Sequence, residues 1–163
     1  MSSYLNIYVR KANTETCISL VGYSRSNRIY ETFEQVFGNN IESWENPKCQ
    51  SLTIGDLNEW ADYVEAEIKR NEDGIKYYQN LQQYIKTTSA SLDDIMERYH
   101  EYQDMIDYHK EELEDLIKTS HWVYFLKQIH EEQQMLEKDW PGTLWIYAGI
   151  DGSNPYPDNK EVK

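Results

Sequence analysis

The most constraining feature of this sequence is a repeat of largely apolar residues whose spacing alternates between four and three. It starts at Leu57 and ends at Ile85, and its positions are 57, 61, 64, 68, 71, 75, 78, 82 and 85. An average spacing of 3.5 residues keeps one side of an α-helix against a partner helix, as in a coiled coil. The repeat therefore predicts a helix over residues 54–86, which Thr53 and Asp56 begin as a capping pair.

A second repeat of the same spacing predicts the partner helix, over residues 92–139. Ser91 and Asp94 provide its capping signal, and residues 87–90 make a turn short enough for the two helices to run antiparallel. The first positions of its seam are Ile95, Tyr99, Tyr102, Ile106, His109, Leu113 and Leu116. The phase changes near Ser120, and the pattern continues as Trp122, Leu126, Ile129, Gln133, Leu136 and Trp140.

Shorter elements are predicted at the two ends of the chain. Alternating apolar residues indicate strands over residues 4–11, 17–23 and 143–150, and residues 41–51 are predicted to be a loop. A short helix is expected over residues 28–37, with a buried side formed by Ile29, Phe33 and either Val36 or Phe37. The predicted fold class is therefore α+β, with a small antiparallel three-stranded sheet, a short helix and a long projecting antiparallel coiled-coil helical hairpin.

The length of the chain favours a single domain over residues 1–163 with one core. Within that domain, residues 1–53 and 120–151 are expected to form the α+β base. Residues 54–119 are expected to form the coiled-coil hairpin, and residues 152–163 a flexible tail.

The net charge of −13 is concentrated in the predicted hairpin. Residues 54–139 contain 21 acidic and 9 basic residues, whereas the rest of the chain contains 8 and 7. This distribution argues against direct binding of nucleic acid, which requires clustered Lys and Arg. It favours a protein partner with a basic surface, for which the binding candidates are Glu111, Glu112, Glu114 and Asp115. An alternative is that the acidic face mimics nucleic-acid phosphates and blocks a nucleic-acid-binding protein.

The junction before the short helix is a candidate anion site, formed by Ser24, Arg25, Ser26, Asn27 and Arg28. Free amides at a helix N-terminus favour an anion, so a phosphate- or nucleotide-binding function is an alternative. A plainer interpretation is that Ser26 or Asn27 caps the helix and that the arginines pair with nearby acids such as Glu31.

The sequence contains no motif that predicts catalysis or a cofactor. There is no nucleophile elbow and no Gly-rich nucleotide loop, and Glu97 and His100 form only half of a di-iron motif. We therefore predict a protein that is not an enzyme, with no metal and no cofactor. Asn71 and His109 lie on the two seams and are predicted to fix the register of the helices. Counting from the turn places Asn71 opposite residues 102–106, a little short of His109, while Gly74 is interpreted as a cost to the helix.

The remaining features concern the compartment. Cys17 and Cys49 are too few for a disulfide framework, and no run of 18 apolar residues or signal peptide is present. We expect a cytoplasmic protein that does not bind a membrane. A homo-oligomer with a structural role is a further alternative.

Two stretches of this sequence resemble small proteins of phages and mobile elements. The stretches are SYLNIYVR at residues 3–10 and SRSNRIYETF at residues 24–33, followed by the long helical hairpin and a closing apolar strand. The resemblance implies a phage-encoded accessory or inhibitor protein in the host cytoplasm, and it brings no activity and no catalytic residues. The leading prediction is a non-enzymatic protein-binding module that docks on a host protein through the acidic coiled coil or the aromatic base.

Overall fold

A computed structural model of the chain describes the backbone of residues 4–11, 17–24, 27–38, 50–139 and 144–150, and the side chains of residues 27–38 and 52–132. The chain separates into two compact units. The first unit comprises Met1–Tyr63 with Thr119–Lys163, and the second comprises Val64–Lys118. The sequence places the first boundary at residue 54, whereas the structure groups residues 54–63 with the first unit.

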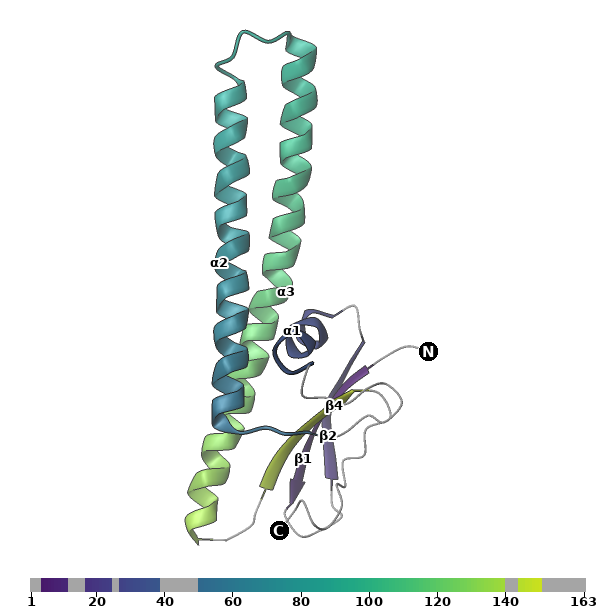
Figure 1. Cartoon of the computed structure of the whole chain (residues 1–163), viewed down its shortest axis with the longest axis vertical. Helices are drawn as coiled ribbons and strands as arrows, with labels where there is room; N and C mark the ends of the chain where they lie inside the picture. Colours follow the sequence, from purple (N-terminus) through teal and green to yellow (C-terminus); the bar gives the residue numbers. More distant parts are fainter. Residues whose placement is uncertain (1–3, 12–16, 25–26, 39–49, 140–143, 151–163) are drawn as a thin grey trace. The chain divides into compact units, whose positions relative to one another are not determined.

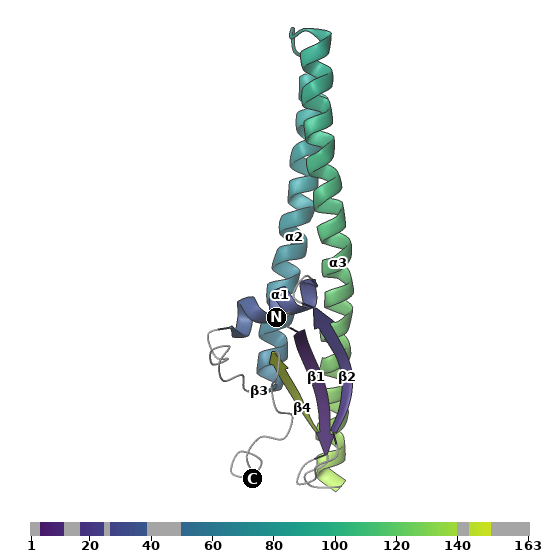
Figure 2. The same ribbon diagram turned by 90° about the vertical axis from the view of Figure 1, so that its right-hand side faces the viewer.

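The first unit contains four antiparallel strands in the order β2-β1-β4-β3. Their bounds are Tyr4–Lys11 for β1, Cys17–Ser24 for β2, Gln50–Ser51 for β3 and Leu144–Ile150 for β4. Strand β1 lies between β2 and β4, with Ile7 opposite Val21 on one side and opposite Ala148 on the other (Figure 2). The first and last strands of the chain are therefore neighbours.

The sequence predicts an α+β fold with a three-stranded sheet, and this prediction is wrong. In the stretches whose side chains are described, 27–38 and 52–132, 89% of the residues are helical, and these stretches contain three helices and no strand. The sheet outside them has four strands, because Gln50 and Ser51, predicted to be in a loop, pair with β4. A two-residue strand is too short to show the alternation by which strands are predicted.

Helix α1 covers Arg28–Phe37 in the first unit and has a buried side wider than predicted. Asn27 is its N-cap, because the Asn27 side-chain oxygen accepts a hydrogen bond from the Ile29 backbone N–H at 2.9 Å. The buried residues of α1 are Ile29, Tyr30, Thr32, Phe33 and Phe37. Of the two predicted alternatives, Phe37 is buried and Val36 is half-buried.

Trp60 completes the core around α1. This residue is fully buried, and its indole Nε1–H donates a hydrogen bond to the Thr32 hydroxyl at 2.9 Å. The rings of Phe33 and Phe37 lie edge-on to the indole, with centroid distances of 5.4 and 6.2 Å. Trp60 lies off the heptad seam, so the start of its helix is buried on a second side.

Two long helices form the predicted helical hairpin, which is confirmed (Figure 1). Helix α2 covers Ile54–Ile85 and helix α3 covers Leu92–Asp139. Thr53 and Asp56 form a reciprocal capping box, with the Thr53 N–H donating to Asp56 Oδ2 at 2.9 Å and the Asp56 N–H donating to Thr53 Oγ1 at 3.1 Å. At the start of α3, the Asp94 N–H donates to Ser91 Oγ at 3.3 Å.

Burial follows the predicted seams closely until the phase change in α3. Every seam position of α2 from Leu57 to Ile85 is buried or half-buried, as is every seam position of α3 from Ile95 to Leu116. Beyond Leu116 the buried positions are Thr119, Val123 and Leu126. In the predicted stripe Leu126 is buried and Trp122 and Ile129 are half-buried, while Thr119 and Val123 are buried outside it. The side chains of Gln133, Leu136 and Trp140 lie outside the described residues.

We expect the Trp60–Thr32 hydrogen bond to stabilise the core around α1. Thr32→Val removes the acceptor at nearly constant volume and should lower the free energy of unfolding in urea by about 1–3 kcal/mol, because a buried indole N–H loses its partner. Thr87→Val, at an exposed turn position, is the control and should cost less than about 1 kcal/mol. The double variant Thr32→Val/Trp60→Phe should cost less than the sum of its single variants. Strict additivity would contradict this role.

Candidate functional site

The second unit contains a buried polar contact between α2 and α3. Asn71 is 8% exposed, and its Oδ1 lies 2.9 Å from Nδ1 of the half-buried His109. The Asn71 Nδ2 donates to the Glu67 backbone carbonyl at 2.9 Å, so Oδ1 is the atom turned toward the imidazole, and it accepts the Nδ1 proton. The two residues predicted from the seams to fix the register are thus brought together.

Because Gly74 has no side chain, the His109 ring can pack directly against α2. A Cβ atom at Gly74 would lie 2.8 Å from His109 Nε2 and 2.9 Å from His109 Cε1, closer than such contacts occur in proteins. A glycine inside a helix costs about 1 kcal/mol relative to Ala. That cost is offset here by the approach of the imidazole to the helix backbone, which any other residue at this position would obstruct.

A row of aromatic rings crosses the hairpin at this point, and we call Tyr77, Tyr78, His109 and Tyr108 the aromatic row. Tyr78 stacks on His109 with a centroid distance of 5.9 Å and an interplanar angle of 28°. Tyr77 lies edge-on to Tyr78 at 5.1 Å, and Tyr108 lies edge-on to His109 at 5.5 Å. Tyr77 and Tyr108 are exposed, so the aromatic row extends from the Asn71–His109 contact to the surface on both helices.

A second polar contact joins the helices nearer to the turn. Gln82 is 7% exposed, and its Nε2 donates to Gln103 Oε1 at 3.0 Å. Gln103 in turn donates to Asp107 Oδ1 at 3.0 Å. Gln103 lies off the predicted seam, and only its position one turn after Tyr99 could have indicated it. The polar side chains inside the hairpin are therefore engaged with one another.

The candidate anion junction is only partly within the described residues. Ser24 ends β2, where it lies opposite Tyr4, while Arg25 and Ser26 lie outside the described residues. Asn27 is occupied as the cap of α1, as the plainer interpretation predicts.

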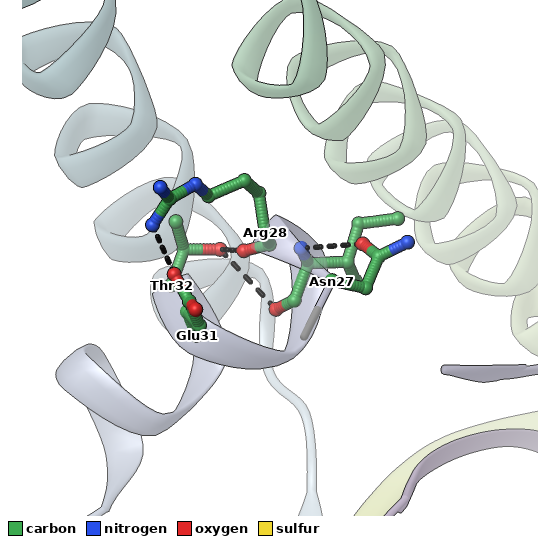
Figure 3. Close-up of polar contacts among 5 residues, drawn as sticks. Asn27, Arg28, Glu31 and Thr32 are labelled. Atoms are coloured by element: carbon green, nitrogen blue, oxygen red, sulfur yellow. Dashed lines mark hydrogen bonds and ion pairs between the residues drawn. The ribbon is translucent and has the colours of Figure 1, made fainter. Parts of the chain in front are cut away.

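Arg28, the last candidate of this junction, forms an ion pair with Glu31 (Figure 3). The Thr32 hydroxyl donates to the Arg28 carbonyl at 2.8 Å and to the Ile29 carbonyl at 3.2 Å. The described part of the junction thus shows the local contacts of a helix start. Anion binding by these residues stays a prediction.

The predicted partner-binding acids lie on α3 in the second unit. Glu111, Glu114 and Asp115 are exposed, whereas Glu112 is half-buried. Glu114 Oε1 lies 3.6 Å from the ammonium of Lys118, one turn further along the helix. Because an exposed ion pair of this kind contributes only about 0–1 kcal/mol, the Glu114–Lys118 pair adds little to the stability of the hairpin.

Within the part of the chain whose side chains are described, no group of three or more His, Cys, Asp or Glu residues is placed to hold a metal ion. Among the described residues, no helix is long and apolar enough to cross a membrane. The chain matches no family model, no curated protein and no solved structure. The resemblance to phage and mobile-element proteins therefore stays a prediction.

We expect Gly74→Ala to destabilise the protein by about 1–2 kcal/mol, because the added methyl group overpacks the His109 ring. Gly55→Ala is the matched control, since its Cβ would meet only Thr53 Oγ1 at an ordinary 3.6 Å. It should be neutral or stabilising, as helix propensity favours Ala. In a His109→Ala background, Gly74→Ala should also become stabilising. Equal stabilisation by both glycine substitutions in the natural background would contradict this account; urea unfolding measures all of them.

The Asn71–His109 pair is expected to fix the register of α2 against α3 at some cost in the stability of the hairpin. Asn71→Leu alone should lower the unfolding free energy by about 1–3 kcal/mol, because His109 Nδ1–H loses its acceptor. Asn71→Leu/His109→Leu should be more stable than this single variant while populating shifted alignments or oligomers. Sedimentation equilibrium and the dispersion of amide NMR signals measure that loss of uniqueness. If the double variant has the same mass in solution as the natural chain and also gives a single set of sharp amide signals, the pair does not fix the register.

Proposed function

We propose that this chain is a non-enzymatic protein-binding module whose acidic helical hairpin docks on a basic surface of a partner protein. The observation that carries the proposal is the surface of the second unit, which combines acidic charge with large exposed apolar side chains. Residues 64–118 contain 14 acidic and 7 basic residues. The exposed large apolar side chains of this unit are Tyr77, Tyr84, Leu92, Met96, Met105, Tyr108 and Ile117.

This combination supports binding of a protein for two physical reasons. Aromatic and Met side chains are enriched in protein interfaces, where a few residues, Tyr often among them, carry most of the binding energy. Acidic charge steers a basic partner toward the hairpin and repels like-charged surfaces, including a second copy of this chain. The polar side chains inside the hairpin, Asn71, His109 and Gln82, hold the two helices together, so their described contacts are structural.

The setting proposed for this binding is the cytoplasm of a host cell. The resemblance of residues 3–10 and 24–33 to phage and mobile-element proteins supports an accessory or inhibitor protein that acts on a host protein. In that setting the partner would normally use its basic surface for another ligand, and occupation by the hairpin would block it.

Charge reversal tests the proposal. A variant with Glu111, Glu112, Glu114 and Asp115 all replaced by Lys should keep its helix content by circular dichroism, because most of these side chains are exposed. It should lose the partner that co-purifies with a tagged natural chain from its host. Retained co-purification that does not depend on salt concentration would rule out the acidic face.

A second variant controls for net charge alone. Replacing Glu59, Asp62, Glu65 and Glu72 with Lys changes the net charge by the same amount at exposed positions of α2. It should retain more of the partner than the α3 variant does. Equal loss in both would show that the partner responds to overall charge rather than to a docking face on α3.

A further inference from the structure

We infer that the hairpin carries one docking face, centred on Gly74, and that its occupant is an amphipathic helix that presents arginine next to apolar side chains. We call Tyr77, Met105 and Tyr108 the tyrosine face. The inference rests on the proposed function and adds to it the location of the interface and the chemistry of the partner.

The contacts of His109 place these three side chains on one side of the hairpin. Residues three or four positions apart share a helix face, so Tyr77 lies with Gly74 on α2, and Met105 lies with His109 on α3. Gly74 and His109 are in direct contact, which brings the two faces side by side. The rings of the aromatic row then connect Tyr77 to Tyr108 without interruption, at centroid distances of 5.1, 5.9 and 5.5 Å.

These side chains are exposed where a two-helix hairpin would be expected to show polar groups. Tyr77 is 59% exposed, Tyr108 52% and Met105 37%. Tyr and Met are residue types that interfaces use, and Tyr loses little conformational entropy when a partner covers it. Between them the His109 ring covers the backbone of Gly74, so the surface that a partner meets here is made of aromatic rings.

The charges next to the tyrosine face select arginine in the partner. Within about one turn of its residues, the exposed acidic side chains outnumber the exposed basic ones. The acids are Asp73, Glu101, Asp104, Asp107 and Glu111, and the bases are Lys76 and Lys110. Guanidinium groups stack on tyrosine rings and bind carboxylates in a bidentate manner, whereas the ammonium of Lys acts as a point charge. A second copy of this chain is a poor occupant, because its hairpin presents the same acidic charge.

A helix is the partner element that fits a face made by two antiparallel helices. Its apolar side chains can pack on Tyr77, Met105 and Tyr108 with helix-in-groove spacing, while its arginines reach the flanking carboxylates. The tyrosine face and the acids around it extend along several turns of α3, from Glu101 to Glu111. An Arg- and Leu-bearing amphipathic helix matches both the apolar and the charged parts of this surface.

Fluorescence anisotropy with labelled synthetic peptides tests this inference on the full chain. Three amphipathic peptides share a Leu face and carry Arg, Lys or Glu on the other face. The Leu–Arg peptide should bind at least about threefold more tightly than the Leu–Lys peptide, and the Leu–Glu peptide should not bind. Tyr77→Ala/Tyr108→Ala should weaken binding of the Leu–Arg peptide about tenfold or more.

The exposed Tyr124 provides a matched control, because it is 62% exposed and lies on α3 in the first unit. Tyr124→Ala should leave the affinity for the Leu–Arg peptide within about twofold, well below the effect of an interface residue. Equal weakening by Tyr124→Ala and by the tyrosine-face variant, or binding of the Leu–Glu peptide as tight as that of the Leu–Arg peptide, would overturn the inference. Circular dichroism of each variant verifies that the helices are intact.

Failure of this inference can be separated from failure of the proposed function. If the Tyr77→Ala/Tyr108→Ala variant keeps the natural partner that the Glu111–Asp115 charge reversal loses, the tyrosine face is wrong and the protein-binding function stands. If the natural chain retains no protein from its host at any salt concentration, the proposed function is wrong, and the docking face is wrong with it.

Discussion

The close approach of α2 and α3 at Gly74 is the constraint on which the rest of the hairpin depends. An apolar seam with a seven-residue repeat allows several alignments that differ by one heptad. In the observed alignment Gly74 lies against the imidazole of His109, and the amide of Asn71 accepts its Nδ1 proton. A shift by one heptad would place side chains against the ring and leave both polar groups without partners. The register, and with it the side chains that meet on the surface, follows from this contact.

The helices could be predicted from the sequence because their signals are local. Heptad spacing and the capping residues Thr53, Asp56 and Ser91 determine a helix within one or two turns, and the structure has both helices with these caps. The fold class could not be predicted, since the α+β expectation gave the short terminal elements the same weight as two helices of 32 and 48 residues. Trp60 was missed for a related reason: one repeat describes one partner, whereas the start of α2 also packs on α1.

The polar pair inside the hairpin was predictable by residue but not by geometry. Asn71 and His109 stand out because they interrupt apolar seams, yet counting from the turn placed Asn71 opposite residues 102–106. That count assumes that facing residues are centred on residues 88 and 89, whereas the observed Asn71–His109 contact is centred on residue 90. Gly74 was interpreted only as a cost to the helix, because helix propensity can be judged from the sequence whereas the contact with His109 cannot. The aromatic row includes His109 and depends on the same contact, so it could not be predicted from the sequence.

The contact between Gly74 and His109 also constrains how the chain can evolve. A side chain at position 74 destabilises this fold unless position 109 has lost its ring, so neither site can change first without a penalty. Related chains should therefore retain both residues or exchange both, and single replacements should be rare among them. Exposed positions such as Tyr84 carry no such linkage and are free to vary independently. Positions 74 and 109, which are 35 positions apart in the sequence, should therefore covary among related chains.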